Sequence, residues 1–341
     1  MLDTLAPSPF DLASDVAYRP WREQKLRHRA RDAGELLVDL GDPRHLNTPD
    51  RARLLERIAR HGVAVYRSPR TEDDPTLPRA LGVQLGLLRL DANWLADEDG
   101  LSRIAVAAGG AAGAGRTGGT GGTGGTRGEF IPYTDHAIGW HTDGYYHPEA
   151  RRILAMILHC VRPAAVGGET TLLDHELVYI ALRDESPALV RALMHPKAMT
   201  IPAREDDGGV ARAAQSGPVF SVVEGPAGPQ LHMRYTARTR SIEWRDDALT
   251  REAAARLARM MDGELGGILH LTLQPGMGLV GHNVLHARSA FRDDPRAPRL
   301  LYRARYLDAV TGSATRGAGV PRDAPAPGPA AGATEGAWRI G

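Results

Sequence analysis

Short apolar runs separated by glycine, proline and charged residues fill the C-terminal two thirds of the chain. Such runs are typical of strands, and helical patterns stand between some of them. We expect strands at Val63–Tyr66, Ile153–Val161, Val219–Val223, Leu231–Thr236, Ile268–Leu273, Gly278–Val280 and Leu300–Leu307. Many short strands with helices inserted between them predict a mixed α+β fold with a β-sandwich or barrel core.

Three segments have the periodicity and the end signals of helices. The first begins at Thr48, which we expect to cap its free N–H groups, and Gly62 stands where a helix usually stops. A second helical pattern covers His175–Leu193. A third begins at Thr250, also an expected cap, and runs to about Met261.

Composition divides the chain into one domain and three less regular segments. Residues 1–34 are polar and Arg-rich, which predicts a solvated N-terminal arm or a short helix. One domain is expected over 35–310, interrupted by a flexible Gly-rich loop at 109–128, and a disordered tail over 311–341. A Gly-x-Gly-x-x-Gly pattern at Gly113–Gly118 is attributed to chance, because no helix follows as a dinucleotide site requires. The loop is compatible with a lid over the site or with a surface insertion.

Charge and cysteine content restrict the class of protein. The 42 Lys and Arg residues against 41 Asp and Glu leave a net charge of +1, so no bulk attraction for nucleic acid or membrane is expected. The single cysteine, Cys160, excludes an internal disulfide, and neither a signal peptide nor a bilayer-spanning apolar run is visible. We therefore expect a cytoplasmic protein that binds a small molecule and leave open whether it forms a homo-oligomer.

The tripeptide His141-Thr-Asp143 is the first candidate for metal chemistry. On an extended strand, residues two apart face the same side, so an imidazole and a carboxylate at this spacing can bind one ion. Iron(II) that must also bind substrates suits two imidazoles and one carboxylate, which leave coordination positions open. A second such pair, His147-Pro-Glu149, is less favoured because proline bends it.

A third ligand and a co-substrate site are expected further along the chain. His286 is the candidate ligand, with His282 left as an alternative four residues earlier, and Arg299 lies thirteen residues after His286. A 2-oxoglutarate bound to iron needs a cation for its far carboxylate, and a guanidinium fits that group in bidentate fashion. Thr170, within the GGETTLLD segment, has a hydroxyl that can share this carboxylate.

These segments together resemble the TauD/TfdA family of 2-oxoglutarate dioxygenases, the clavaminate synthase-like group. The resemblance extends from about Leu36 to Asp308, and its most specific parts are HTDG at 141–144, GGET at 167–170 and NVLHARSAF at 283–291. The family fold implies a double-stranded β-helix, a distorted jelly roll, with flanking and inserted helices.

By position, the resemblance assigns roles to six residues. His141, Asp143 and His286 match the catalytic metal ligands. Thr170 and Arg299 match the groups that hold 2-oxoglutarate, and Arg303 matches a position that faces an anionic substrate group in some members. The family's usual Asp-Asn-Arg stretch before the distal histidine is absent here.

The remaining substrate candidates border the metal tripeptide or a second predicted wall of the pocket. They are Tyr145, Tyr146, Arg234 and Tyr235. A structural role weighs evenly against substrate contact for Arg234 and Tyr235, while Arg238 and Arg240 fit a solvated surface better. The number of arginines favours a small anionic or zwitterionic metabolite.

The implied activity is that of an Fe(II)- and 2-oxoglutarate-dependent dioxygenase that uses O2 and releases succinate and CO2. Because halogenating relatives lack the carboxylate at the position of Asp143, hydroxylation of an unactivated C–H bond is the expected reaction. Two alternatives stay open: a zinc- or manganese-dependent hydrolase with the same three ligands, and a non-enzymatic jelly-roll binding protein.

Overall fold

A six-stranded sheet forms one half of the core in the computed structural model, which describes residues 8–91, 101–106, 131–206, 209–226, 228–238 and 242–311. Neighbouring strands are antiparallel except for the parallel pair β1–β2. The strand order is β1 (Leu37–Asp39), β2 (Val63–Arg67), β16 (Met277–His282), β5 (Ala155–Arg162), β19 (Leu300–Tyr306) and β3 (Ser102–Ile104).

A four-stranded antiparallel sheet packs against the first. Its order is β15 (Leu269–Leu271), β7 (Thr170–Leu173), β17 (Leu285–Arg288) and β4 (Ile138–His141). Val65 and Leu279 from the larger sheet share one buried cluster with Leu172 and Leu269 from the smaller one. The two sheets therefore face each other across a common apolar layer.

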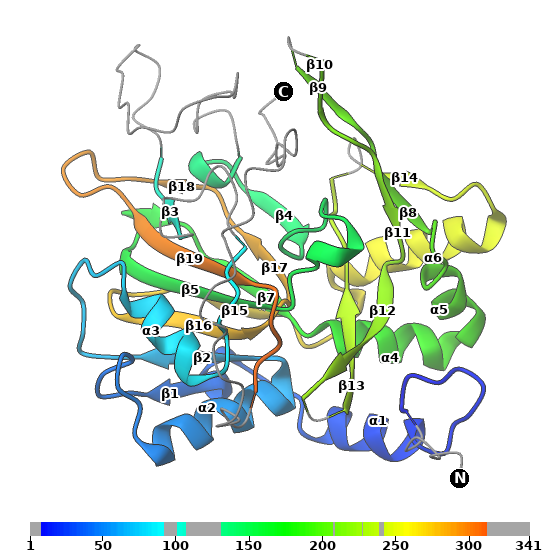
Figure 1. Ribbon diagram of the computed structural model, residues 1–341, viewed down its shortest axis with the longest axis horizontal. Coiled ribbons are helices and arrows are strands. Elements are labelled where there is room, and N and C mark those ends of the chain that lie inside the picture. Colours follow the sequence, from blue (N-terminus) through cyan, green and yellow to red (C-terminus); the bar gives the residue numbers. More distant parts are fainter. Residues whose placement is uncertain are drawn as a thin grey trace, which may run out of the picture.

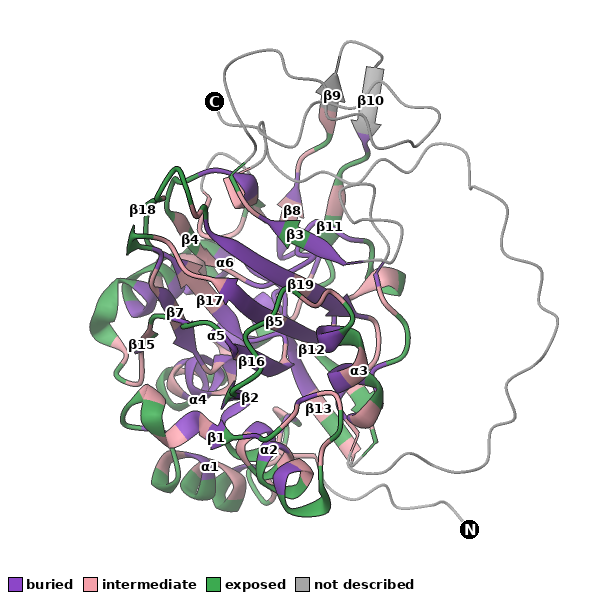
Figure 2. Cartoon of the chain, turned by 90° about the vertical axis from the view of Figure 1, so that its left-hand side faces the viewer, coloured by how far each residue is buried: buried purple, intermediate pink, exposed green. Residues whose placement is uncertain are grey.

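The other face of the six-stranded sheet is covered by α2 (Thr48–His61) and α3 (Leu77–Gln84), as Figure 1 shows. Alternation along the strands separates the two layers: Val65 faces the smaller sheet, while its neighbour Tyr66 faces the helices. In Figure 2, β5, β16 and β19 are buried along most of their length, whereas α1 and α2 expose their outer sides. The mixed α and β class predicted from the pattern is confirmed.

The predicted helices are present, but both predicted caps are wrong. Asn47, not Thr48, caps α2, because its side chain accepts a hydrogen bond from the N–H of Asp50. Asp247, not Thr250, caps α6 in the same way. The predicted stop at Gly62 is confirmed, since this residue has a φ of 78° that favours glycine.

A second group of helices lies beside the β12–β13 hairpin, on the right of Figure 1. It contains α4 (His175–Glu185), α5 (Pro187–Leu193), α6 (Ala248–Arg259) and the π-helical turn Met260–Glu264. The accompanying strands are β8 (Met199–Ile201), β9 (Arg204–Asp206), β10 (Gly209–Arg212), β11 (Gln215–Gly217), β12 (Phe220–Gly225), β13 (Gly228–Met233) and β14 (Glu243–Trp244). The remaining short elements are β6 (Val166–Gly167), β18 (Phe291–Arg292), and the 3-10 turns Ala33–Leu36, Ile131–Tyr133 and Glu149–Arg151.

The N-terminal segment was expected to be a solvated arm or a short helix, and the structure contains a helix there, α1 (Tyr18–Arg27). Lys25 on α1 is buried, and its ammonium group pairs with Asp174 at 2.6 Å and also with Glu176. Burial alone would lower the pKa of Lys25, but the two carboxylates raise it above its ordinary value. The helix is thereby fastened to the start of α4.

Several predictions concern residues outside the described ranges. The Gly-rich loop, the Gly113–Gly118 pattern, Arg240 and nearly all of the C-terminal tail belong to them. Within the described ranges, no helix combines the length and the apolar character that crossing a bilayer demands.

Four histidines outside the candidate metal group, His61, His159, His232 and His282, predict that the protein loses stability in acid. Burial lowers the pKa of His61, His159 and His282 to about 4 and holds that of His232 well below its ordinary value. The unfolded chain therefore binds more protons below pH 6.5, so this stability is present above pH 6.5 and is lost as the pH falls towards 4. Each histidine contributes a slope of at most about 1.4 kcal/mol per pH unit.

Urea unfolding at pH 7.5, 6.0 and 5.0 measures this slope. We expect His159→Gln to make it shallower, whereas His28→Gln, which changes an exposed histidine, should leave it unchanged. A free energy of unfolding that is constant from pH 7.5 to 5.0 contradicts the prediction.

Candidate metal centre and active site

Strand register brings the two predicted histidine ligands together. β4 ends at His141, and β17 pairs with it so that His286 lies directly opposite His141. The two ring centroids are 4.2 Å apart, and Asp143 follows in the turn after β4. One potential ligand atom from each of the three residues lies within 4.8 Å of the others, which gives a compact two-histidine, one-carboxylate group.

Hydrogen bonds fix which nitrogen each imidazole presents. Nδ1 of His141 lies 2.9 Å from the carbonyl oxygen of Gly139, and Nδ1 of His286 lies 2.9 Å from that of Val284. A carbonyl can only accept, so each Nδ1 carries the proton and each Nε2 keeps its lone pair. Burial lowers the pKa of His141 to about 3 and also lowers that of His286, so both rings are neutral at pH 7.

Asp143 is held by its backbone and by one carboxylate oxygen. Its N–H donates to Oδ1 of Asn283 at 2.8 Å, and Nδ2 of Asn283 donates back to its carbonyl oxygen at 2.8 Å. Nη1 of Arg303 donates to Oδ1 of Asp143 at 3.1 Å. Burial would raise the pKa of Asp143, but the positive charges of Arg303 and Arg305 oppose this, and the pKa lies below its ordinary value. The other oxygen, Oδ2, is buried and has no partner among the described residues.

The competing ligand candidates lie elsewhere. His282 is near Glu176 and Lys25, whose charges influence it, and it is not part of the compact group. In the second tripeptide, Nδ1 of His147 bonds to a backbone carbonyl and Glu149 pairs with Arg152 at 2.6 Å. The geometry therefore favours the first tripeptide with His286.

Arg299 and the GGET segment meet at one place in the structure. Arg299 is only 4% exposed, and its Nη1 has no partner among the described residues. A Cβ at Gly168 would lie 3.5 Å from Nε of Arg299, so the glycine turn borders this guanidinium. Thr170, buried on β7, stands opposite Arg288 in the register of β7 and β17. A buried guanidinium nitrogen without a hydrogen-bond partner suits an anion, which is the task predicted for Arg299.

A cavity of about 180 Å³ opens beside two of the candidate metal ligands, His141 and Asp143. Its wall contains His141, Asp143, Tyr145, Tyr146, Arg238 and Arg303. Three of the predicted substrate residues, Tyr145, Tyr146 and Arg303, therefore border the same space as His141 and Asp143.

Comparison with known proteins agrees with this geometry. Residues 25–305 match the model of a family described as taurine catabolism dioxygenase TauD, TfdA family. The chain belongs to the TauD/TfdA family. A uridine-5'-phosphate dioxygenase from a Streptomyces species is 34% identical over 187 residues, which cover 52% of this chain and 64% of that protein. The match thus spans less than two thirds of this relative's own length.

Solved structures of two oxygenases share the fold of this TauD/TfdA member. An asparagine oxygenase is 17% identical with a TM-score of 0.51, and the match covers 85% of this chain and 91% of the other. The non-haem iron oxygenase OrfP, solved with iron and alpha-ketoglutaric acid, is 19% identical with a TM-score of 0.50, and the match covers 76% and 80%. At these identities the likeness extends to the fold alone.

Arg234 and Tyr235 are held within the structure of this TauD/TfdA chain, and neither lines the larger cavity. The guanidinium of Arg234 donates to four carbonyl oxygens, those of Tyr145, Met199, Gln215 and Gly217, at 2.7 to 3.4 Å. Tyr235 packs in the apolar core, and its main chain pairs with Thr142. Both observations favour the structural interpretation of these residues.

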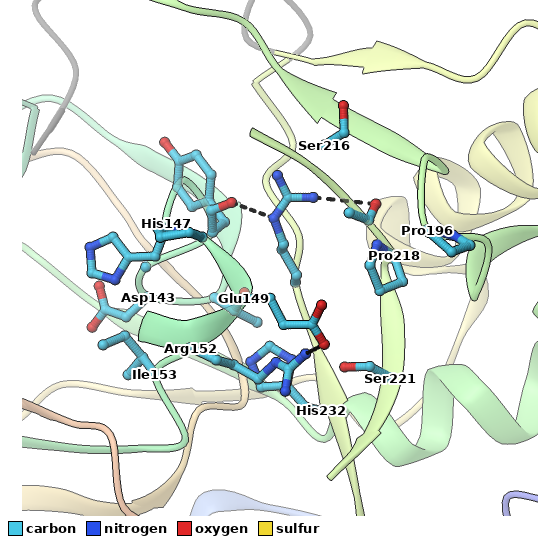
Figure 3. A pocket seen from close by; sticks show the side chains of 16 residues that line it. Asp143, His147, Glu149, Arg152, Ile153, Pro196, Ser216, Pro218, Ser221 and His232 are labelled. Carbon is cyan, nitrogen blue, oxygen red and sulfur yellow. Dashed lines mark hydrogen bonds and ion pairs between the residues drawn. The ribbon is translucent and has the colours of Figure 1, made fainter. Parts of the chain in front are cut away.

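Arg234 also borders a second, smaller cavity of about 80 Å³ behind the turn that carries Asp143 (Figure 3). His147, Glu149 and Arg152 line it on the side of the metal tripeptide, and Ser216, Pro218 and Ser221 line it on the other side. The Asp143 turn therefore separates this space from the larger cavity, since Asp143 and Tyr145 border both.

Sequence reasoning missed Asp91, which pairs with Arg305 in the wall of the larger cavity. Asp91 is 2% exposed and pairs with Arg305 at 2.7 Å and with Arg151 at 2.5 Å. Arg305, two residues after Arg303 on β19, donates to the hydroxyl oxygen of Tyr146 at 2.8 Å. No local signal identifies Asp91, because its partners come from distant segments.

Proposed function

We propose that this chain is an Fe(II)- and 2-oxoglutarate-dependent dioxygenase whose iron is held by His141, Asp143 and His286. The observation that carries the proposal is the convergence of these three side chains within 4.8 Å of one another, with His141 and Asp143 in the wall of the larger cavity. Family membership supports the same activity.

The residues present fit the metal. Both imidazoles direct an unprotonated Nε2 away from their backbone partners, and Asp143 keeps one oxygen free for an ion. Two imidazoles and one carboxylate leave positions open for a co-substrate and O2. When bound, the iron supplies the coupled chemistry in which 2-oxoglutarate is converted to succinate and CO2 and the substrate is oxidised. Arg303 keeps Asp143 ionised and oriented for this task.

Arg299 and Thr170 are proposed to hold the far carboxylate of 2-oxoglutarate. A buried guanidinium binds a carboxylate more strongly than an exposed one, because little water competes for it, and Nη1 of Arg299 has no partner among the described residues. The adjacent glycine turn lets a ligand approach, since no side chain fills that space.

We expect Arg299→Met to raise the KM for 2-oxoglutarate about 30-fold or more, since removing one partner of a buried charge pair costs about 2–5 kcal/mol. Initial rates at varied 2-oxoglutarate concentration measure the effect. Arg296→Met removes an exposed guanidinium from the same loop and is the control. Equal KM values in the two variants contradict the role of Arg299.

The substrate is proposed to be a small anionic metabolite. Arg303 and Arg238 border the cavity together with Tyr145 and Tyr146, which supply aromatic surface. The Streptomyces relative is named for uridine 5'-phosphate, an anionic nucleotide, and this makes nucleoside monophosphates the first compounds to test. Hydroxylation is the expected outcome.

The two facing sheets are proposed to form the double-stranded β-helix that the family resemblance implies. Their shared apolar layer and the position of the metal group at the end of the smaller sheet support this assignment.

A succinate assay tests the proposed function. The protein is loaded with iron(II) without oxygen, mixed with 2-oxoglutarate and a metabolite panel that pairs uridine 5'-phosphate with uridine, and then exposed to air. We expect succinate release that needs iron and O2 and that an anionic compound stimulates. Substrate cleavage by the zinc- or manganese-loaded protein without O2 would instead support the hydrolase.

A further inference from the structure

Arg288 is a buried arginine to which neither the sequence motif nor the proposed chemistry gives a task. It lies on β17, two residues after His286, and is 7% exposed. Its Nη1 donates to the carbonyl oxygen of Pro132 at 3.3 Å, and its Nη2 donates to those of Thr134 at 2.8 Å and His136 at 2.5 Å. One side chain thus binds the carbonyl groups of every second residue from 132 to 136.

The segment that Arg288 holds is a wall of the larger cavity. Ile131, Pro132 and Ala137 line that cavity, and the segment leads directly into β4 and its ligand His141. Its regular structure is a single 3-10 turn, Ile131–Tyr133, so its remaining carbonyls need partners from other segments. Arg288 supplies them from the strand that carries the opposite ligand.

Phe291 completes this connection and extends it to Arg299. Its N–H donates to the carbonyl oxygen of Asp135 at 3.0 Å, so it holds the same wall. The guanidinium carbons of Arg288 and Arg299 lie 4.7 and 5.0 Å from the centroid of its ring. Two cations therefore share one aromatic ring, and one of them is the proposed 2-oxoglutarate group.

The hydrogen bonds found for the Arg288 guanidinium in the described part of the chain all go to carbonyl oxygens, and its Nε has no partner there. Burying a guanidinium with only neutral carbonyl partners costs free energy, because they offset the lost hydration of the charge only in part. A dicarboxylate that binds Arg299 relieves the repulsion between the two cations and favours the arrangement that holds the wall.

We propose that Arg288 is a positioning residue that fixes the 131–137 wall relative to the metal ligands and, through Phe291, makes this wall respond to 2-oxoglutarate bound at Arg299. The proposal rests on the proposed function for the second of these tasks. Its consequence is that substrate binds more tightly to the protein that already holds 2-oxoglutarate.

Arg288→Met tests the proposal, with Arg292→Met as the control, because Arg292 is an exposed arginine on β18 close by in sequence. Rates and product ratios are measured with iron(II), 2-oxoglutarate and the substrate found in the succinate assay. We expect the substrate KM to rise about 10-fold or more, since hydrogen bonds to a charged group are among the stronger ones. The ratio of succinate to oxidised product should also rise, because a displaced substrate is not oxidised.

Two further measurements distinguish the proposed positioning role of Arg288 from a purely structural role. 2-Oxoglutarate binding to the manganese-loaded variant, measured without O2 by calorimetry, should stay within about 3-fold of the wild type, since Arg299 is intact. Phe291→Leu keeps the Arg288 hydrogen bonds, so at low 2-oxoglutarate its substrate KM should equal that of the wild type. At saturating 2-oxoglutarate the substrate KM of the wild type should fall, whereas that of Phe291→Leu should not. An unchanged KM and an unchanged product ratio in Arg288→Met overturn the proposal.

Amide hydrogen exchange keeps the test independent of catalysis. Peptides covering 131–138 should exchange faster in Arg288→Met than in the wild type and in Arg292→Met, whether or not the enzyme turns over. If the methionine variant does not fold, Arg288→Lys is used, because lysine keeps the charge but cannot reach three carbonyls at once. Absence of succinate from the wild type rejects the proposed function, whereas unchanged exchange rejects the positioning role.

Discussion

Replacement of Asp143 with alanine is expected to abolish 2-oxoglutarate turnover and to weaken iron binding more than about 100-fold, since loss of groups one step further from a metal already costs 10- to 100-fold. Asp143 supplies the only carboxylate of the compact group, and its Oδ2 is the oxygen left for the ion. The alanine variant also leaves Arg303 without its acceptor at 3.1 Å. Both effects act on the same site.

Iron binding is measured by anaerobic titration, and turnover is measured as succinate released. Glu149→Ala is the matched control, because it removes an exposed carboxylate from the second tripeptide. Asp143→Asn preserves the shape of the side chain and checks that the loss does not come from misfolding. Iron affinity of the alanine variant equal to that of the Glu149 control would reject Asp143 as a ligand.

Lys25→Met is expected to lower the free energy of unfolding by about 3–5 kcal/mol, the usual cost of removing one partner of a buried ion pair. Lys25 is 7% exposed and pairs with Asp174 and Glu176, which are themselves mostly buried. Without the ammonium group, two carboxylates face each other in a poorly solvated place. The link between α1 and α4 weakens accordingly.

Urea unfolding at pH 7.5 measures this loss, and Lys197→Met, at an exposed lysine, should be close to neutral. Adding Glu176→Gln to Lys25→Met removes one of the two opposed charges and should recover part of the stability. Asp174 is left unchanged, because it also caps α4. A loss no larger than that of the Lys197 control contradicts the prediction.

Much of the metal group could be predicted because its two halves are local. The tripeptide 141–143 and the segment around His286 each fit within a few residues, and the spacing to Arg299 is also local. The register that places His286 opposite His141 is not local, since strands far apart in the sequence pair through the fold. The roles of these residues remain predictions until they are tested.

Other features were beyond sequence reasoning for identifiable reasons. Asn47 and Asp247 cap their helices in place of the nearby threonines. Several adjacent side chains can accept the same hydrogen bond, and backbone geometry decides which of them does so. Arg288 and Asn283 lie inside the NVLHARSAF segment, yet their partners belong to distant loops. Asp91 had no signal, since a lone aspartate in sequence does not reveal that it is buried between two arginines.

Asn283 bears on the order in which this protein is assembled. Its carboxamide both donates to and accepts from the backbone of Asp143, and it also donates to the carbonyl oxygen of Ile153. Hydrogen bonds within the chain therefore close the long loop between the two halves of the metal group without an ion. Folding alone thus offsets the entropic cost of closing that loop. We expect the polypeptide to fold first and to bind its ion afterwards. Iron would then be exchangeable in the folded protein and would not be required for folding.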